Sequence, residues 1–389
     1  KFCLLTLAGQ QGGVPEAEFA FFAHRTSDLE DPERRFTLSP DDLVLINPNT
    51  RTAPVFRTRH DAEITKKIYR TLPVLVREGD PAGNPWGIEY QRMFDMSNDS
   101  HLFRTAQELR AGGAQLRGNV WEDGTRRWLP LYEGRLGHQF NHRFATNEGA
   151  EREVSESERD DPTFVVSPAV WVSSEHFEER MARRAHGSSF GLLGHRRVAR
   201  STDERTVISC VLPHGPASYG WILSVGPSAH GLAVLGAIYN SFVFDYCARN
   251  SLTQPSFPQA TFQQLPAPTP SDLATTQYPV SGRLDQWIMD RVLELSYTAW
   301  DLKGFAAELG CACPPFRWDQ TRRELLRAEL DATFFHLYGL DRDEVDYVMD
   351  TFPIVRRKDE RAHGEYRTKR LILERYDAVA EAISTGTEY

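Results

Sequence analysis

The feature that most constrains the fold is a change of sequence pattern at Leu265-Pro-Ala-Pro-Thr-Pro270. Before this segment, short apolar runs alternate with turns that contain Gly and Pro, and after it apolar residues recur at helical spacing. A segment so rich in proline cannot continue a helix or a central strand, so it is predicted to be a linker. We therefore expect an α+β fold, in which a mixed α/β part is followed by a C-terminal all-α helical region.

The part before the linker is expected to be rich in strands and turns. One amphipathic helix is predicted over residues 60–72, whereas residues 84–150 indicate irregular chain with short strands. The charged stretch Glu151–Asp161 is predicted to be an exposed loop. The predicted strands are Phe2–Leu7, Phe19–Ala23, Leu43–Ile46, Thr163–Val166, Val207–Leu212 and Gly220–Val225.

The predicted helices lie mostly in the second half of the chain. One runs from Ala229 to about Arg249, and the later ones cover residues 283–302 and 319–338, a short segment from Asp341, and Tyr366–Ser384. Asp319 is a suitable N-cap and Gly339 a suitable stop for one of them. Glu344 follows Asp341 at the spacing of a capping box.

Cysteine content and hydropathy indicate the cellular environment in which the chain folds. No run approaches the roughly 18 apolar residues that a membrane helix needs, so no membrane contact is expected. The cysteines are odd in number and lack the spacing of a disulfide framework or a metal site, which indicates a reducing, cytoplasmic location and no bound metal. They are Cys3, Cys210, Cys247, Cys311 and Cys313.

The net charge of −9 does not by itself indicate a nucleic-acid-binding protein, so the distribution of charge matters more. Residues 271–389 hold 16 basic and 22 acidic residues, a net charge of −6. Basic clusters lie within residues 51–70 and in the segment from His195 to Arg205. Local basic patches on an acidic body are compatible with DNA binding.

Motifs for several kinds of catalysis are missing. An amino-methyltransferase needs a Gly-rich turn for S-adenosylmethionine and an Asn/Asp-Pro-Pro-aromatic loop for the target amino group, and the sequence has neither. Asn47-Pro-Asn-Thr50, Asn84-Pro-Trp86 and Pro314-Pro-Phe316 are the nearest strings. No Gly-x-Ser-x-Gly elbow is present either. We therefore expect no catalytic residue in this chain.

Two constellations admit a metal or a structural interpretation. His138-Gln-Phe-Asn-His142 has the His-x-x-x-His spacing of a zinc helix, but Gln139 stands where the zinc proteases have Glu. Glu89, Asp95 and Asp99 could form a nuclease cluster, and the alternative is a loop held by side-chain-to-backbone hydrogen bonds. The structural interpretation is favoured for both, because no further ligand or Glu/Asp-x-Lys string accompanies them.

Three segments combine basic and amide side chains that suit DNA contact. Asn47–Arg59 places Arg51, Arg57 and Arg59 on a turn and an extended strip that could grip phosphates, or form a solvated strand edge. The second runs from Leu129 to Arg143, and the third is Arg196–Thr206. For the third, the alternative is a network of arginines and carboxylates that orders the start of a strand.

Several strings along the chain occur together in one known family. They are Lys1–Leu7, Asn47–Thr52, Phe94–Phe103, Pro130–Gly134, His138–Phe144, Arg200–Thr206, Tyr239–Tyr246, Tyr338–Leu340, Asp350–Ile354 and Gly364–Lys369. Taken jointly, they resemble the large adenine-specific DNA methyltransferases of the Eco57I-like, type IIG and phage-defence (BREX- and DISARM-like) kind. The chain departs from that family at Ser251–Phe257, where members often have His or Gly-His.

The resemblance implies the part of such a protein that follows its catalytic domain. Residues 1–45 would be the last strands of the methyltransferase domain, 46–150 a connecting and DNA-contacting region, 151–270 the target-recognition domain and 271–389 the helical C-terminal domain. S-adenosylmethionine would bind in the catalytic domain and not in this chain. DNA contact is then carried over to Tyr132, Arg135, His138, Gln139, Arg143, Arg196, Arg197, Arg200, Arg205 and Thr206.

The favoured hypothesis is therefore a module that recognises double-stranded DNA for an N6-adenine methyltransferase of a restriction-modification or phage-defence system. Such an enzyme flips its adenine out of the duplex, so a separate module must hold the remaining DNA in register. An alternative is a protein-interaction module, whose acidic tail docks the methyltransferase domain, a nuclease or another defence subunit. A metal-dependent nuclease using Asp95, Asp99, His138 and His142 is the third hypothesis.

Overall fold

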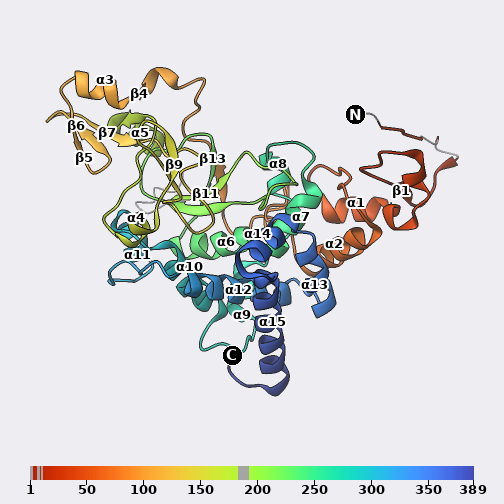
Figure 1. The fold of residues 1–389 in the computed structure, drawn as a ribbon. Coiled ribbons are helices and arrows are strands. Elements are labelled where there is room, and N and C mark those ends of the chain that lie inside the picture. The colour runs from red at the N-terminus through yellow and green to blue at the C-terminus, as the bar shows by residue number, and fades with distance from the viewer. Residues whose placement is uncertain (1–2, 7–8, 10–11, 183–191) are drawn as a thin grey trace.

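The computed structural model describes residues 3–6, 9, 12–182 and 192–389. It has an α+β fold, with antiparallel sheets in the first part and helices concentrated in the second. In Figure 1 the strands lie at the upper left and the C-terminal helices below them, while the N-terminal elements lie at the right. The predicted fold class, a mixed part followed by a helical region, is confirmed.

The N-terminal elements are more helical than the sequence predicts. Strands β1 (Ala17–Phe19) and β2 (Phe36–Leu38) pair antiparallel, and α1 (Pro40–Ile46) and α2 (Arg59–Thr71) follow. The predicted strand Leu43–Ile46 is wrong because Ser39 and Asp42 form a capping box and Pro40 opens a helix there. Residues 3–6 are not in a strand, and the other positions of the predicted strand Phe2–Leu7 lie outside the described residues.

The remaining predictions for the first part are met unevenly. The helix over residues 60–72 is confirmed as α2, but of Phe19–Ala23 only Phe19 is in a strand. Thr163–Val166 is coil, and the predicted loop Glu151–Asp161 contains β9 (Glu151–Glu153) and α4 (Glu156–Asp160). Two short 3-10 helices, η2 (Thr26–Leu29) and η3 (Pro32–Arg34), connect β1 to β2.

A five-stranded antiparallel sheet forms the outer part of the strand-rich region. Its order is β4-β10-β7-β6-β5, and Trp171 of β10 faces Arg104 on one side and Pro130 on the other. Helices α3 (Ala106–Ala111) and α5 (Ser174–Ala182) and the 3-10 helix η4 (Ser100–Leu102) accompany it, and β8 (Ala145–Asn147) pairs with β9. The strands are β4 (Phe103–Arg104), β5 (Gln115–Arg117), β6 (Val120–Glu122), β7 (Arg127–Pro130) and β10 (Trp171–Ser173).

A four-stranded antiparallel sheet lies between that region and the helices, in the order β12-β11-β13-β3. The strands are β3 (Glu89–Gln91), β11 (Leu192–Arg196), β12 (Ser209–Leu212) and β13 (Trp221–Val225). The predicted strands Val207–Leu212 and Gly220–Val225 are thus confirmed with small shifts at their starts. Helix α6 (Ala229–Asn240) packs against β11 and β12 and covers one face of this sheet.

The predicted helix from Ala229 to Arg249 is two helices, α6 and α7 (Phe242–Ser251), which meet at an angle of 66°. Ser241 ends the first and caps the second, because its hydroxyl accepts a hydrogen bond from the Phe244 amide. Nearly every residue of both helices is buried. Among the described residues no single helix is long and apolar enough to cross a membrane, although this bent pair meets the length and composition criteria.

The predicted linker at residues 265–270 is irregular as far as Thr269, and most of it is buried. Leu265 and Ala267 are buried, and Leu75 donates its amide to the Leu265 carbonyl at 2.9 Å. Ala267 in turn donates to the carbonyl of Pro73 at 2.9 Å. The prolines prevent regular structure as expected, but apolar neighbours and these backbone bonds hold the segment inside the protein.

The second part is helical as predicted, and it contains additional short helices. Asp319 caps α12, Gly339 lies just beyond its end with a φ of 72°, and Asp341 and Glu344 form the capping box of α13. The helices are α8 (Gln259–Phe262), α9 (Pro270–Thr275), α10 (Leu284–Ser296), η5 (Trp300–Leu302), α11 (Lys303–Glu308), α12 (Gln320–Leu337), α13 (Arg342–Asp350), α14 (Pro353–His363) and α15 (Arg367–Thr385). The helix Pro353–His363 is not among the predicted ones.

The hydrophobic core joins regions that are distant in the sequence. One cluster of buried side chains contains residues from Phe36 to Tyr376, and a second, from Met93 to Leu223, lies within the strand-rich region. The large cluster includes apolar residues of α2, α6, α7, α10, α12 and α15. Helices and the four-stranded sheet are therefore held together by shared apolar burial.

The cysteines depart from the reduced state expected from their number and spacing. A turn after α11 brings the Cα atoms of Cys311 and Cys313 to 5.4 Å, and the two residues form a disulfide. Cys3 is an exposed free thiol, whereas Cys210 and Cys247 are free and buried.

Candidate nucleic-acid interface

Four separate segments meet at one end of the four-stranded sheet. Residues 216–220 run between residues 93–95 and 131–134, because Tyr219 donates its amide to the Phe94 carbonyl at 2.6 Å and Ser218 donates to the Tyr132 carbonyl at 2.9 Å. The fourth segment follows β11, where the Arg197 amide donates to the Gly220 carbonyl at 3.0 Å.

Glycine is needed at the contact between two of these segments. A Cβ atom on Gly220 would lie 2.9 Å from the backbone nitrogen of Gly134, closer than side chains allow. This close approach brings Arg135 beside the arginines that follow β11.

The arginines carried by these segments form what we call the arginine cluster: Arg92, Arg135, Arg196, Arg197 and Arg200. Tyr219 lies among them, with the guanidinium carbons of Arg92 and Arg197 at 4.9 and 4.3 Å from its ring centre. These distances are within the range of cation–π contact. The sequence predicts four of the five arginines as DNA contacts, and Arg92 and Tyr219 are the residues it misses.

The charges of the arginine cluster are mostly not neutralised within the chain. Arg135 pairs with Glu151 at 3.2 Å, but no carboxylate of a described residue lies within 4 Å of the four other guanidinium groups. Asp95 lies at its edge, and the pKa of this carboxyl is lowered first by the amides of Ser97 and Asn98 and then by Arg197 and Arg92. The cluster is therefore a concentrated positive surface on a chain of net negative charge.

Arg196 is the least exposed member of the cluster. Its Nη2 atom donates to the Gly137 carbonyl at 2.5 Å, and burial lowers the pKa of its guanidinium. Arg92 and Arg200 are exposed, and Arg197 is half-buried. The exposed members are the ones that can reach a ligand on the surface.

Arg143, predicted as a DNA contact, has a structural role instead. It is 1% exposed, and its guanidinium donates to the backbone carbonyls of Asp161 at 2.7 Å and Thr298 at 3.0 Å. Further bonds go to the carbonyls of Glu158, Arg159 and Phe164. One arginine with several donors thus fixes the loop after α4 against the helical part, which leaves it no surface for DNA.

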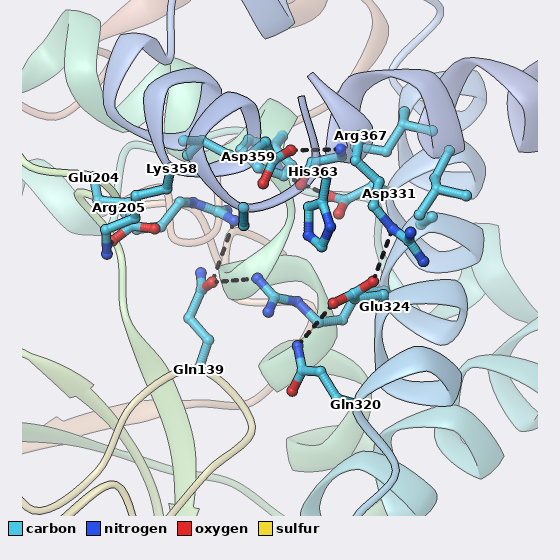
Figure 2. Close-up of a pocket in the computed structure, with 18 of the residues that line it drawn as sticks. Gln139, Glu204, Arg205, Gln320, Glu324, Asp331, Lys358, Asp359, His363 and Arg367 are labelled. Atoms are coloured by element: carbon cyan, nitrogen blue, oxygen red, sulfur yellow. Dashed lines mark hydrogen bonds and ion pairs between the residues drawn. The ribbon is translucent and has the colours of Figure 1, made fainter. Parts of the chain in front are cut away.

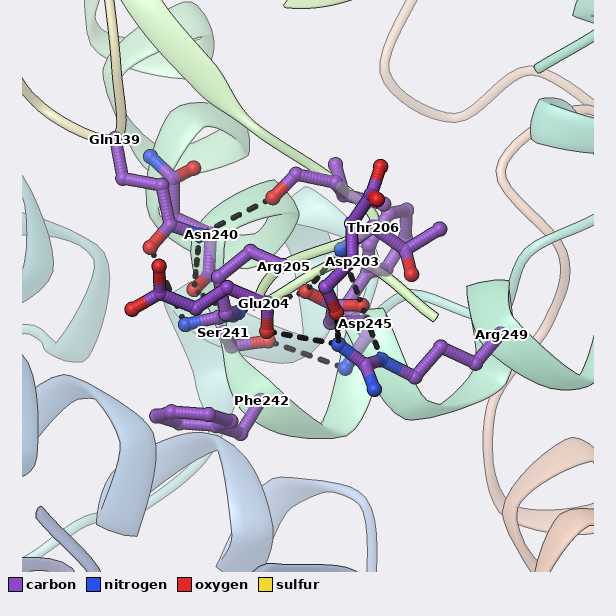
Figure 3. Close-up of polar contacts among 12 residues, drawn as sticks. Gln139, Asp203, Glu204, Arg205, Thr206, Asn240, Ser241, Phe242, Asp245 and Arg249 are labelled. Atoms are coloured by element: carbon purple, nitrogen blue, oxygen red, sulfur yellow. Dashed lines mark hydrogen bonds and ion pairs between the residues drawn. The ribbon is translucent and has the colours of Figure 1, made fainter. Parts of the chain in front are cut away.

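Arg205 and Thr206 are also buried, in the network shown in Figure 3. Arg205 pairs with Asp245 of α7 at 2.7 Å, and the Thr206 amide donates to the same carboxylate at 3.0 Å. Arg249 pairs with Asp245 at 3.2 Å and donates to the Asp203 carbonyl. This is the network of arginines and carboxylates that the sequence offers as the alternative for this segment, and it orders the chain that leads into β12.

Three more predicted contacts point into the protein. Tyr132 is buried and donates its hydroxyl to the His142 carbonyl at 3.1 Å, and Gln139 is buried and donates to the Val207 carbonyl at 3.1 Å. His138 is half-buried beside Phe144. The pKa of His138 is lowered to about 3 by burial and then by neighbouring arginines, so this imidazole is neutral at pH 7.

The strip Asn47–Arg59 begins with a turn, as predicted, and its arginines are exposed, but Arg59 is the first residue of α2 and does not share an extended segment with Arg57. Arg51 occupies the left-handed region with a φ of 53°, and Arg57 lies over the ring of Phe22 at 4.4 Å. Arg59 donates to the carbonyl of Arg35. Asn47 and Asn49 bond to backbone groups and fix the turn.

The loop Leu252–Phe257 lies between this strip and the arginine cluster. At one end the Val55 amide donates to the Asn250 carbonyl at 2.9 Å, and at the other the Phe257 amide donates to the Arg197 carbonyl at 2.8 Å. Thr253, Gln254 and Pro255 are exposed between these two attachments. The loop in which the chain departs from the resembled family is therefore placed beside both basic segments.

The acidic residues of the nuclease hypothesis form a loop with internal hydrogen bonds. Asp95 accepts from the amides of Ser97 and Asn98, and Asp99 accepts from the Asp95 amide at 2.8 Å and pairs with Arg180. His142 pairs with Asp301 at 2.8 Å. Within residues 3–6, 9, 12–182 and 192–389, no group of three or more His, Cys, Asp or Glu side chains is arranged to hold a metal ion.

Neither the protein-family models nor the curated proteins compared with this sequence give a match.

Proposed function

We propose that this chain recognises double-stranded DNA as a specificity module of an S-adenosylmethionine-dependent N6-adenine DNA methyltransferase. The observation that carries the proposal is the arginine cluster, where the guanidinium groups of Arg92 and Arg197 flank the ring of Tyr219 and no carboxylate of a described residue lies within 4 Å of either. Surface charges of one sign attract ions of the opposite sign, so such a group favours binding of an anionic partner.

DNA is the partner that suits this arrangement best. A duplex presents a dense row of phosphates, and arginine binds a phosphate through two parallel hydrogen bonds. Arg51, Arg57 and Arg59 extend the basic surface on the other side of the loop Leu252–Phe257. Phosphate contacts of this kind hold the duplex in register, and side chains of adjoining loops can then read base edges.

The catalytic half of the reaction belongs to a partner in this proposal. A methyltransferase domain binds the methyl donor and the flipped adenine, and the module described here holds the surrounding duplex.

The test is DNA binding by the whole chain, measured by fluorescence anisotropy with a randomised duplex pool over a series of salt concentrations. The triple variant Arg92→Glu, Arg197→Glu, Arg200→Glu is expected to bind roughly 100-fold more weakly, and its salt slope is expected to fall by about 3. Sequencing of the bound pool then reveals any recognition site.

The control carries the same change of charge elsewhere. Arg317, Arg357 and Arg361 are exposed arginines of the helical part, and their replacement by Glu is expected to change the affinity less than about threefold. Equal losses in both triple variants would contradict a localised site. Absence of binding by the unaltered chain at low salt would favour the protein-interaction module instead.

A further inference from the structure

A second site for anions is indicated by a cavity of about 300 Å³ on the helical side of the molecule. Helices α12, α14 and α15 form most of its wall, and the loop that carries His138 and Gln139 closes it from the sheet side. Figure 2 shows Gln139 facing Glu324 and Gln320 of α12 across this space, with Lys358 and Asp359 of α14 at its far edge. Its size is at the lower end of the range for small-molecule sites.

Most charges along the cavity wall are paired with one another. Arg367 pairs with Glu324 at 3.1 Å, and Lys358 pairs with Glu204. Arg205 pairs with Asp245 behind the wall. These pairs need no further counter-ion.

Arg327 of α12 is the exception. No carboxylate of a described residue lies within 4 Å of its guanidinium, and its hydrogen-bond partner is the neutral amide oxygen of Gln139 at 3.1 Å. That oxygen also accepts a bond from Arg205 at 3.2 Å, so two cations share one uncharged acceptor. Burial and then the nearby Arg205 lower the pKa of Arg327, while the more distant carboxylates of Asp331, Glu204 and Glu324 act in the opposite direction.

Positively charged side chains surround His138 at this end of the cavity. His138 adjoins Arg196, Arg327, Arg205 and Lys358, and these cations lower its pKa together with burial. Asp331, one turn after Arg327, is buried and accepts the Phe242 amide at 2.7 Å, while burial raises its pKa to about 6. Its carboxylate lies more than 4 Å from the guanidinium of Arg327, which lines the cavity and has donors left for a ligand.

We infer that this cavity binds a small oxyanion, such as a phosphate or carboxylate group, through Arg327. Desolvating an unpaired cation is costly, and an oxyanion that receives two guanidinium hydrogen bonds offsets that cost. The neutral imidazole of His138 can donate one more hydrogen bond to the same anion. The site is distinct from the arginine cluster, and it does not depend on the DNA-binding proposal.

The test is isothermal titration calorimetry of the whole chain with inorganic pyrophosphate, at constant ionic strength in a chloride buffer. The unaltered chain is expected to show saturable binding at one site. Arg327→Gln is expected to weaken that binding at least 10-fold. Arg322→Gln is the matched control, because Arg322 lies on the same helix but is exposed and pairs with Glu294, and its affinity is expected to stay within twofold.

A second variant guards against a folding defect in Arg327→Gln. Lys358 is exposed, so Lys358→Gln should fold normally, and it leaves Glu204 unpaired beside the cavity. A loss of about threefold is expected, because the freed carboxylate repels the anion. Absence of saturable binding by the unaltered chain, or equal affinities of the unaltered chain and a folded Arg327→Gln variant, would overturn the inference. DNA binding is measured separately, so failure of one proposal leaves the other intact.

Discussion

The arginine cluster and the Arg205–Asp245 network differ sharply, although only a few residues separate them in the sequence. Arg197 and Arg200 carry charges without a carboxylate within 4 Å among the described residues, whereas Arg205 is 4% exposed and bonded to Asp245. The difference is one of secondary structure. The first group follows the end of β11 at the surface, while the second precedes β12, where the chain passes over the N-terminal turn of α7. Residues of one type in one segment thus lie in two different environments.

The largest expected effect is a loss of stability when the Arg205–Asp245 network is broken. Asp245→Asn removes the charge that compensates Arg205 and Arg249, and breaking a buried pair in this way costs about 3–5 kcal/mol. Urea unfolding monitored by circular dichroism measures the change. Glu360→Gln, which breaks the exposed pair with Arg356, is the control and should cost less than about 1 kcal/mol. Similar costs for the two variants would mean that the network is not structural.

The next largest expected effect is a dependence of the unfolding free energy on pH. Burial raises the pKa of Asp331 to about 6 from its usual 3.8, so the folded state holds this proton more tightly than the unfolded chain does. The contribution to stability is therefore complete below about pH 4 and is lost as pH rises through 6, a change of about 3 kcal/mol. Subtracting the unfolding free energies of Asp331→Asn from those of the unaltered chain between pH 4 and 7 isolates it. A difference that does not vary with pH would show that Asp331 is ionised throughout.

A smaller expected effect is on duplex binding, and it tests the arginine cluster. Tyr219 orients Arg92 and Arg197, so Tyr219→Ala is expected to weaken duplex binding about fivefold, which corresponds to about 1 kcal/mol. Tyr219→Phe keeps the ring and should bind like the unaltered chain. If both variants lose affinity equally, the hydroxyl and not the ring is important.

Local signals predict the elements that the sequence encodes by itself. The helix over residues 60–72 and the caps at Asp319 and Asp341 are found where the sequence puts them, because periodicity and capping depend on near neighbours. Leu43–Ile46 is wrong as a strand for a related reason. Its apolar run suits either structure, and the capping box at Ser39 decides for helix.

Long-range contacts explain what the sequence does not predict. Arg143 and Arg196 are both arginines in basic or polar segments, yet Arg143 bonds to carbonyls from Glu158 to Thr298 and Arg196 lies at the surface cluster. Residues 265–270 are buried because they pair with the chain at Pro73 and Leu75. Arg92 joins the cluster only through the bonds that place residues 216–220 between two other segments. None of these partners is near in sequence, so no local pattern reveals them.

The smallest expected effect is the change in stability when the arginine cluster is altered. The triple variant Arg92→Glu, Arg197→Glu, Arg200→Glu should change the free energy of unfolding by less than about 1 kcal/mol, because surface charges without partners contribute little to stability. Urea unfolding under the conditions used for Asp245→Asn gives the value. A loss approaching that of Asp245→Asn would mean that these arginines make structural contacts, and their effect on DNA binding would then be indirect. Unchanged stability together with lost binding is the result that separates a binding surface from the structural network formed by Arg205 and Asp245.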